Sequence, residues 1–122
     1  MRDYQPKKSP YAMERSVYMR TLALVRDYPR MRRAYEQVVG NCVSSTEEQV
    51  MRAERLGADI RAVHTALAHI PQEYHAGILD NIIFRVPMIR IEGACEKTWS
   101  RWRSRFLWEI ANQMHLIDRD GK

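Results

Sequence analysis

The sequence predicts an all-α fold, a small helical bundle that ends in a C-terminal helix-turn-helix. Apolar residues recur at spacings of three and four along most of the chain, which is the period of an amphipathic helix. Glycine and proline, which interrupt helices, number five each, and no segment carries a convincing strand pattern. With 122 residues the chain is long enough for one domain with a buried core.

Two helices are predicted before residue 40. The first runs from Tyr11 to Tyr28, because proline disfavours helical geometry in the residue before it and Pro29 follows. Pro29 suits the first position of a second helix, which continues to Val39 and stops at Gly40. The apolar stripes are Tyr18, Leu22 and Val25 in the first helix, and Tyr28, Met31, Tyr35 and Val38 in the second.

A capping box predicts the start of the third helix. Ser45 is the expected cap, and Glu48 three residues later is the residue that returns a hydrogen bond. The helix has an apolar seam that suits packing against another helix. We expect that partner within the same chain rather than in a dimeric coiled coil. The seam consists of Ala53, Leu56, Ile60, Val63, Leu67 and Ile70.

Two further helices are predicted to form the helix-turn-helix. The first begins at Pro71 and leaves Asp80 and Asn81 exposed beside its apolar face. The connection over residues 85–93 is expected to tuck against the core, and the last helix runs from about Ala94 to Leu116. The apolar residues are Tyr74, Ile78, Ile82 and Ile83 in the helix and Met88, Ile89 and Ile91 in the connection.

The chain divides into four predicted parts. These are a disordered basic arm over residues 1–10, a supporting and dimerisation region over 11–70, the helix-turn-helix over 71–117, and a flexible tail over 118–122. The net charge of +5 is unevenly spread, since Lys and Arg are concentrated before residue 37 and between residues 85 and 105. Concentrated positive charge favours an anionic partner such as nucleic acid, although solvated basic faces have the same composition.

Residues 97–106 interleave aromatic and basic side chains. Trp99, Trp102 and Phe106 share one stripe of a helix, whereas the cations point largely to the opposite side. A buried aromatic stripe fixes such a helix and exposes its cations to phosphates and base edges, as in a DNA recognition helix. The expected contacts are Lys97, Arg101 and Arg105, with Thr98, Ser100 and Ser104 as shorter ones.

Three other features of this helix carry predictions. Arg103 points closer to the aromatic stripe, so it is expected to brace the domain through a carboxylate. From Phe106 onward, apolar residues cover most directions around the axis, which predicts that the second half of the helix is buried. Trp108 lies nearly opposite Trp99 and is the candidate anchor for a protein partner.

A second basic cluster follows Pro29. Arg30, Arg32 and Arg33 are expected to contact backbone phosphates, with a solvated face as the alternative. The N-terminal arm, with Lys7 and Lys8, is expected to remain disordered rather than to enter a minor groove.

The sequence predicts that the protein is not an enzyme and has no metal site or cofactor. The four histidines are scattered, and His64 and His69 are five residues apart, which is wrong for two ligands on one helical face. Cys42 and Cys95 belong to no redox, zinc or nucleophile motif. Since no apolar run approaches the roughly 20 residues of a membrane span, we expect a cytoplasmic protein without a membrane partner.

Three blocks of the sequence together resemble a known family. They are Thr21 to Pro29, then Ile70 to Tyr74 leading to Asp80 to Arg85, and finally Lys97 to Phe106. In order and spacing they resemble the RinA-like and ArpU-like phage transcriptional regulators, whose C-terminal part is similar to region four of sigma factors. The resemblance implies a helix-turn-helix regulator of late phage or prophage genes in a bacterial host cell.

The predicted function is therefore sequence-specific binding of double-stranded DNA in transcription regulation. A homodimer is favoured by the two half-sites that helix-turn-helix proteins often use. Two alternatives stay open. One is a helical interaction module that binds RNA polymerase or another host or phage protein, and the other is an RNA-binding antitermination factor.

Overall fold

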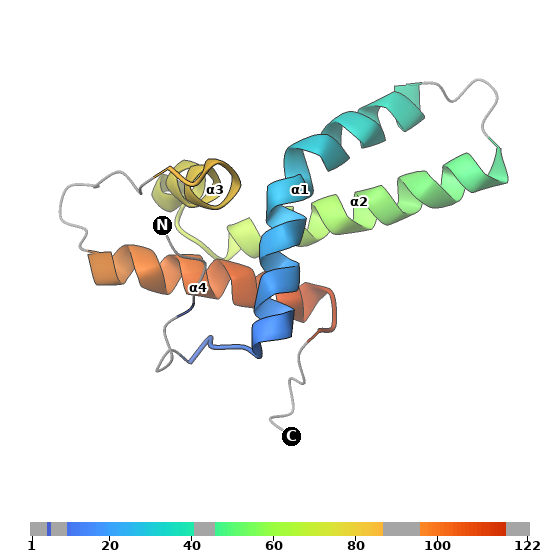
Figure 1. Cartoon of the computed structure of the whole chain (residues 1–122). Helices are drawn as coiled ribbons and strands as arrows, with labels where there is room; N and C mark the ends of the chain where they lie inside the picture. Colours follow the sequence, from blue (N-terminus) through green and yellow to red (C-terminus); the bar gives the residue numbers. More distant parts are fainter. Residues whose placement is uncertain (1–4, 6–9, 41–45, 87–95, 117–122) are drawn as a thin grey trace.

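The computed structural model describes residues 5, 10–40, 46–86 and 96–116, and these form helices joined by turns (Figure 1). In chain order the helices are α1 (Arg15–Gly40), α2 (Glu47–Ala68), the 3-10 helix η2 (Gln72–Tyr74), α3 (His75–Phe84) and α4 (Glu96–Gln113). The described part contains no strand, so the predicted all-α fold is confirmed. None of the helices in these ranges is both long enough and apolar enough to cross a membrane.

α1 is one helix of 26 residues with Pro29 in its interior, so the prediction of two helices separated at Pro29 was wrong. Proline removes a backbone donor and crowds the carbonyl four residues earlier, which ends or bends a helix. Here the buried stripe continues on both sides, with Val25 before the proline and Met31 after it, so packing keeps both halves helical. Figure 1 shows the resulting change of direction midway along α1.

α2 begins one residue later than predicted. The hydroxyl of its N-cap Thr46 accepts from the Gln49 N–H at 3.1 Å, and the Gln49 side chain accepts from the Thr46 N–H at 3.0 Å. Threonine and glutamine thus form the capping box, and the assignment to Ser45 and Glu48 was wrong. Glu48 lies in the first turn, where a carboxylate complements the positive end of the helix dipole. Ser45 lies outside the described residues.

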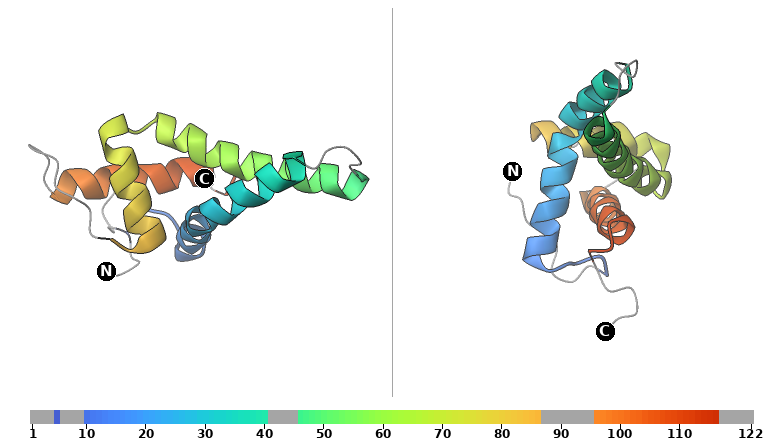
Figure 2. Two further views of the ribbon diagram at one scale, coloured as in Figure 1. Left: turned by 90° about the horizontal axis from the view of Figure 1, so that it is seen from above. Right: turned by 90° about the vertical axis from the view of Figure 1, so that its right-hand side faces the viewer.

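The core lies where the first half of α1, the second half of α2, α3 and α4 meet, and we call this part the body. α2 packs against α1 and α4, which confirms the predicted partner helix within the chain. The outer halves of α1 and α2 extend together away from the body (Figure 2). Fully buried core side chains include Leu22, Val25, Val63, Ile78, Ile82, Phe106, Leu107 and Ile110.

α3 and α4, the predicted helix-turn-helix pair, run across one another rather than alongside (Figures 1 and 2). The predicted apolar face is buried at Tyr74, Ile78 and Ile82. Arg85 is the C-cap of α3; it adopts a left-handed conformation with φ of 57° and donates its N–H to the Asp80 carbonyl. The predicted contacts of the connection, Met88, Ile89 and Ile91, lie outside the described residues, as does the predicted tail over 118–122.

The chain ahead of α1 is tied to the approach to that helix at one described point. The Gln5 side chain accepts from the Met13 N–H at 2.7 Å and donates to the Met13 carbonyl. The rest of the predicted basic arm, apart from Pro10, lies outside the described residues, including Lys7 and Lys8.

Candidate nucleic-acid interface

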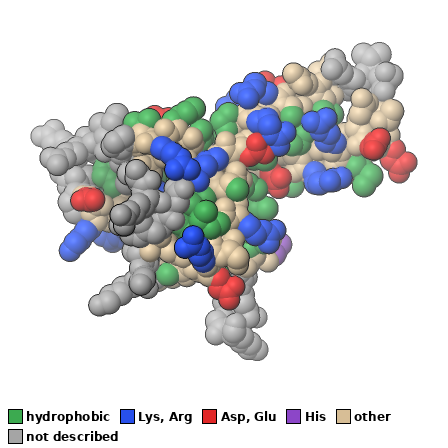
Figure 3. All heavy atoms as spheres, in the orientation of Figure 1, with side chains coloured by type: hydrophobic (Ala, Val, Ile, Leu, Met, Phe, Trp, Pro, Cys, Tyr) green, Lys and Arg blue, Asp and Glu red, His purple; other side chains and the backbone are tan. Residues whose placement is uncertain are grey.

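The first half of α4 has the two faces that the sequence predicts. Trp99 is buried on one side, whereas Lys97 and Arg101 are exposed on the other. Neither cation forms an ion pair with a described acidic residue. Over the whole face shown in Figure 3, Lys and Arg side chains are spread widely rather than gathered in one patch. Whether a cation is available to a ligand therefore depends on its surroundings rather than on the number of cations.

Gly77 of α3 makes room for Trp99. A β-carbon at position 77 would lie 2.6 Å from the indole ring, which is closer than packed atoms approach. The ring of Tyr74 meets the indole edge to face, with centroids 4.7 Å apart. The indole Nε1 is buried and has no hydrogen-bond partner in the described part, so the side chain serves packing. This close fit fixes the rotation of α4 against α3.

Arg103 joins three helices. Its Nε donates to Asn81 Oδ1 of α3 at 2.9 Å, and its Nη1 donates to the Tyr18 hydroxyl of α1 at 2.8 Å. Its predicted position near the core is confirmed, but the expected carboxylate partner was wrong, because an amide and a phenol hold the guanidinium. The expected exposure of Asn81 was wrong too. It is 2% exposed and also donates to the Val86 carbonyl at 2.9 Å.

Two of the expected contact residues face the protein itself. Ser104 is 5% exposed, so the expectation that it faces solvent was wrong. Arg105 is half-buried, with its guanidinium 6.0 Å from the centre of the Tyr11 ring. Tyr11 also meets the edge of Trp108 at 5.7 Å, so the candidate anchor is half-buried by the segment that precedes α1.

Most of the second half of α4 is buried, as predicted, whereas Trp108 and Asn112 are half-buried and Gln113 is exposed. Phe106, Leu107 and Ile110 have no exposed surface. One buried carboxylate lies among them, since Glu109 is 5% exposed and its Oε2 lies 3.2 Å from Nε2 of His69, the C-cap residue of α2. This half of the helix therefore anchors α4 in the body.

The basic cluster of α1 has acidic partners in its own helix. Arg30 donates to both carboxylate oxygens of Asp27, at 2.6 and 2.5 Å. These hydrogen bonds are the main reason that the pKa of Asp27 lies below its usual value. Arg32 Nη2 lies 3.9 Å from Glu36 Oε1. Two of the three arginines are thus balanced by carboxylates one turn away.

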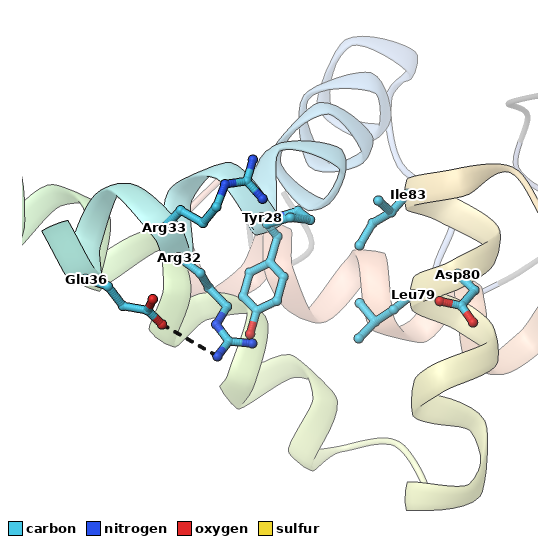
Figure 4. Close-up of a pocket in the computed structure, with 8 residues that line it drawn as sticks. Tyr28, Arg32, Arg33, Glu36, Leu79, Asp80 and Ile83 are labelled. Atoms are coloured by element: carbon cyan, nitrogen blue, oxygen red, sulfur yellow. Dashed lines mark ion pairs between the residues drawn. The ribbon is translucent and has the colours of Figure 1, made fainter.

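Arg32 and Arg33 border a groove of 410 Å³ between α1 and α3 (Figure 4). Apolar side chains of α3 face α1 across it, and its two arginines are matched by two carboxylates. The lining therefore carries no net charge. It consists of Tyr28, Pro29, Arg32, Arg33, Glu36, Leu79, Asp80 and Ile83.

His64, His69 and His75 contact other protein groups rather than one another. The Tyr28 hydroxyl and His64 Nε2 are 2.6 Å apart, and His75 Nε2 lies 2.7 Å from the Ile70 carbonyl oxygen. Within the ranges that the structure describes, no three His, Cys, Asp or Glu side chains are grouped to hold a metal ion.

The sequence analysis did not predict the hydrogen bonds that hold Arg103, nor the role of Gly77 in leaving space for the Trp99 ring. A signal for the first exists, because Asn81 is three residues after Ile78 and so lies near the apolar face of its helix. The role of Gly77 has no comparable signal, since it depends on a ring from a helix far along the chain.

Comparisons of the chain with protein-family models, with curated proteins and with solved structures found no match.

Proposed function

We propose that this chain binds double-stranded DNA in a sequence-specific way and regulates transcription, with the first half of α4 as its recognition helix. The observation that carries the proposal is the exposure of Lys97 and Arg101 on a helix whose other side is fixed by Trp99 and Arg103. A helix fixed in rotation presents its cations in one direction, which base recognition requires.

The exposed cations take different roles in this proposal. Arg101 is the base contact, because a guanidinium can pair with two acceptors of guanine. Lys97 is a phosphate contact, and the half-buried Thr98 and Ser100 supply shorter contacts beside them. Ser104 and Arg105 are left out, since the first is buried and the second stacks on Tyr11.

The α1 cluster contributes less to the proposed interface. Arg30 and Arg32 face carboxylates of their own helix, which weakens their attraction for phosphate. Arg33 is exposed and forms no ion pair with a described residue, so it is the α1 cation retained as a phosphate contact.

Selection from a pool of randomised duplexes tests the proposal, at fixed near-physiological salt and with single-stranded RNA as competitor. We expect one motif to be enriched. Arg101→Ala is expected to weaken binding to that motif by about 1–3 kcal/mol and to relax the preference at one position. Lys97→Ala is expected to weaken binding to all sequences evenly and to reduce the salt slope by about one unit.

The matched control is Arg20→Ala, which removes an exposed arginine of α1 outside the proposed interface. It is expected to bind like the wild type. Failure to enrich any motif would contradict the proposal, as would unchanged affinity and preference in Arg101→Ala. Complete displacement by the RNA competitor would favour the antitermination alternative.

The resemblance to phage regulators extends the proposal to late phage or prophage genes, with RNA polymerase as a second partner in the bacterial host cell. The partial burial of Trp108, whose ring packs against Tyr11, weakens the case for an interaction module, because that module needs an exposed anchor.

A further inference from the structure

The outer part of the α1 and α2 pair, residues 32–40 and 46–61, projects from the body, and we call it the arm (Figures 1 and 2). Its helices come close at Gly57, where a β-carbon would lie 3.2 Å from the ring of Tyr35. Toward the tip, a groove of 340 Å³ lies between the two helices. The seam between α1 and α2 therefore continues past their contact without being filled by any described side chain.

Apolar side chains border this open seam. Val39 of α1 and Val50 of α2 line it, and each is 46% exposed. Met51, next to Val50, is 52% exposed. Half of the large exposed apolar side chains in the described part thus lie on the arm. Apolar exposure concentrated in this way marks an interaction site.

The arm is electrically neutral, unlike the chain as a whole. Residues 32–61 include five arginines and five acidic residues, so the net charge of +5 comes entirely from the other residues. On the face in Figure 3, basic, acidic and apolar side chains intermingle over the arm. Apart from Arg33 at the end nearest the body, such a surface attracts neither a polyanion nor a strongly charged protein. It does complement an identical surface, where each cation can meet an anion.

We propose that the arm binds the arm of a second copy of this chain. In a twofold pair, Val39, Val50 and Met51 of each copy cover the seam of the other, and the four helices share one apolar centre. The proposal stands independently of DNA binding. It does give the dimer two α4 helices, one from each copy.

Sedimentation equilibrium of the full chain tests this pairing. The wild type is expected at twice the monomer mass of 14.5 kDa in the micromolar range. Val50→Glu and Val39→Glu are each expected at the monomer mass with unchanged far-ultraviolet circular dichroism, because a carboxylate in the shared apolar centre is not solvated. The control is Met19→Glu, which changes an exposed methionine of α1 outside the arm and is expected to leave the dimer intact.

Thermal unfolding supplies a second readout. The melting temperature of the wild type is expected to rise with protein concentration, and that of Val50→Glu is expected not to. Met51→Ser, which adds no charge, is expected to raise the dissociation constant by about tenfold. A wild-type mass of 14.5 kDa at every concentration would overturn the proposal. A dimer that survives both valine substitutions, or one that Met19→Glu also dissolves, would overturn it equally.

Discussion

Two arginine-rich stretches, one in α1 and one in α4, have similar composition and opposite surroundings. In α1, Arg30 and Arg32 have carboxylates of the same helix within ion-pair distance. In α4, Arg101 is exposed with no described ion pair, and Arg103 is buried against an amide and a phenol. The same residue type is thus neutralised in one helix, and either left free or used as a brace in the other.

The difference shows that position relative to the buried stripe decides what an arginine does. Arg101 and Arg103 are two residues apart, which turns them by roughly 200° around the helix axis. One therefore faces solvent while the other reaches between helices. In α1, acidic residues three or four positions away lie on the same side as the arginines and reduce their effect on a ligand.

The largest expected effect on stability comes from removing Arg103, the side chain that joins α4 to α1 and α3. Arg103→Ala is expected to lower the free energy of unfolding by about 2–4 kcal/mol, because it strips Asn81 Oδ1 and the Tyr18 hydroxyl of a charged donor and leaves a cavity. Arg101→Ala, two residues away, is expected to change it by no more than about 0.5 kcal/mol. Urea denaturation measures both. Equal losses of unfolding free energy in the two variants would contradict the different roles given to Arg103 and Arg101.

A smaller loss of stability is expected when a side chain is added at Gly77, where the Trp99 ring packs. Gly77→Ala is expected to cost about 1–2 kcal/mol, because crowding against the indole exceeds the gain in helix propensity. Trp99→Phe removes the six-membered ring of the indole that Cβ of residue 77 would meet. In that background Gly77→Ala is expected to stabilise the protein through its higher helix propensity. A double-mutant cycle by chemical denaturation measures this reversal. Destabilisation by alanine in both backgrounds would show that the contact with Trp99 is not the cause.

The smallest expected effect concerns the acidic groups near α1. Burial, and secondarily the charge of Asp27, raise the pKa of Asp59 above its usual value. A carboxyl whose pKa is raised on folding costs stability once it is ionised, so the wild type loses stability as pH rises through that pKa. Asp59→Asn is therefore expected to be slightly more stable than the wild type at neutral pH, and the difference shrinks in acid. Urea denaturation at both pH values measures it, with the exposed Asp80→Asn as control.

The helical fold was predictable from apolar spacing because most core positions come from stripes that are visible locally. The seam of α2 and the face of α3 show this, with Val63 and Ile78 both fully buried. The outcome at Pro29 was not predictable locally. Whether a proline ends or bends a helix depends on packing that continues beyond it, and Met31 supplies that packing.

The candidate site was predictable in outline and not in detail. The aromatic stripe of α4 and the exposure of Lys97 and Arg101 follow from period alone. The positions of Ser104 and Arg105 do not, because they depend on which segments cover the helix from outside. Tyr11, which lies before α1, covers part of that surface. No local sequence pattern predicts that the segment before α1 packs against α4.

The hydrogen bond from Arg103 to the Tyr18 hydroxyl also bears on the order in which the protein assembles. The two residues are 85 positions apart, so this bond forms only after α4 has been synthesised. α1 and α2 can pair much earlier, whereas the side chains that α4 covers stay exposed until it is made. α4 thus completes the described body, and a nascent chain that stalls before α4 presents an open core to chaperones and proteases.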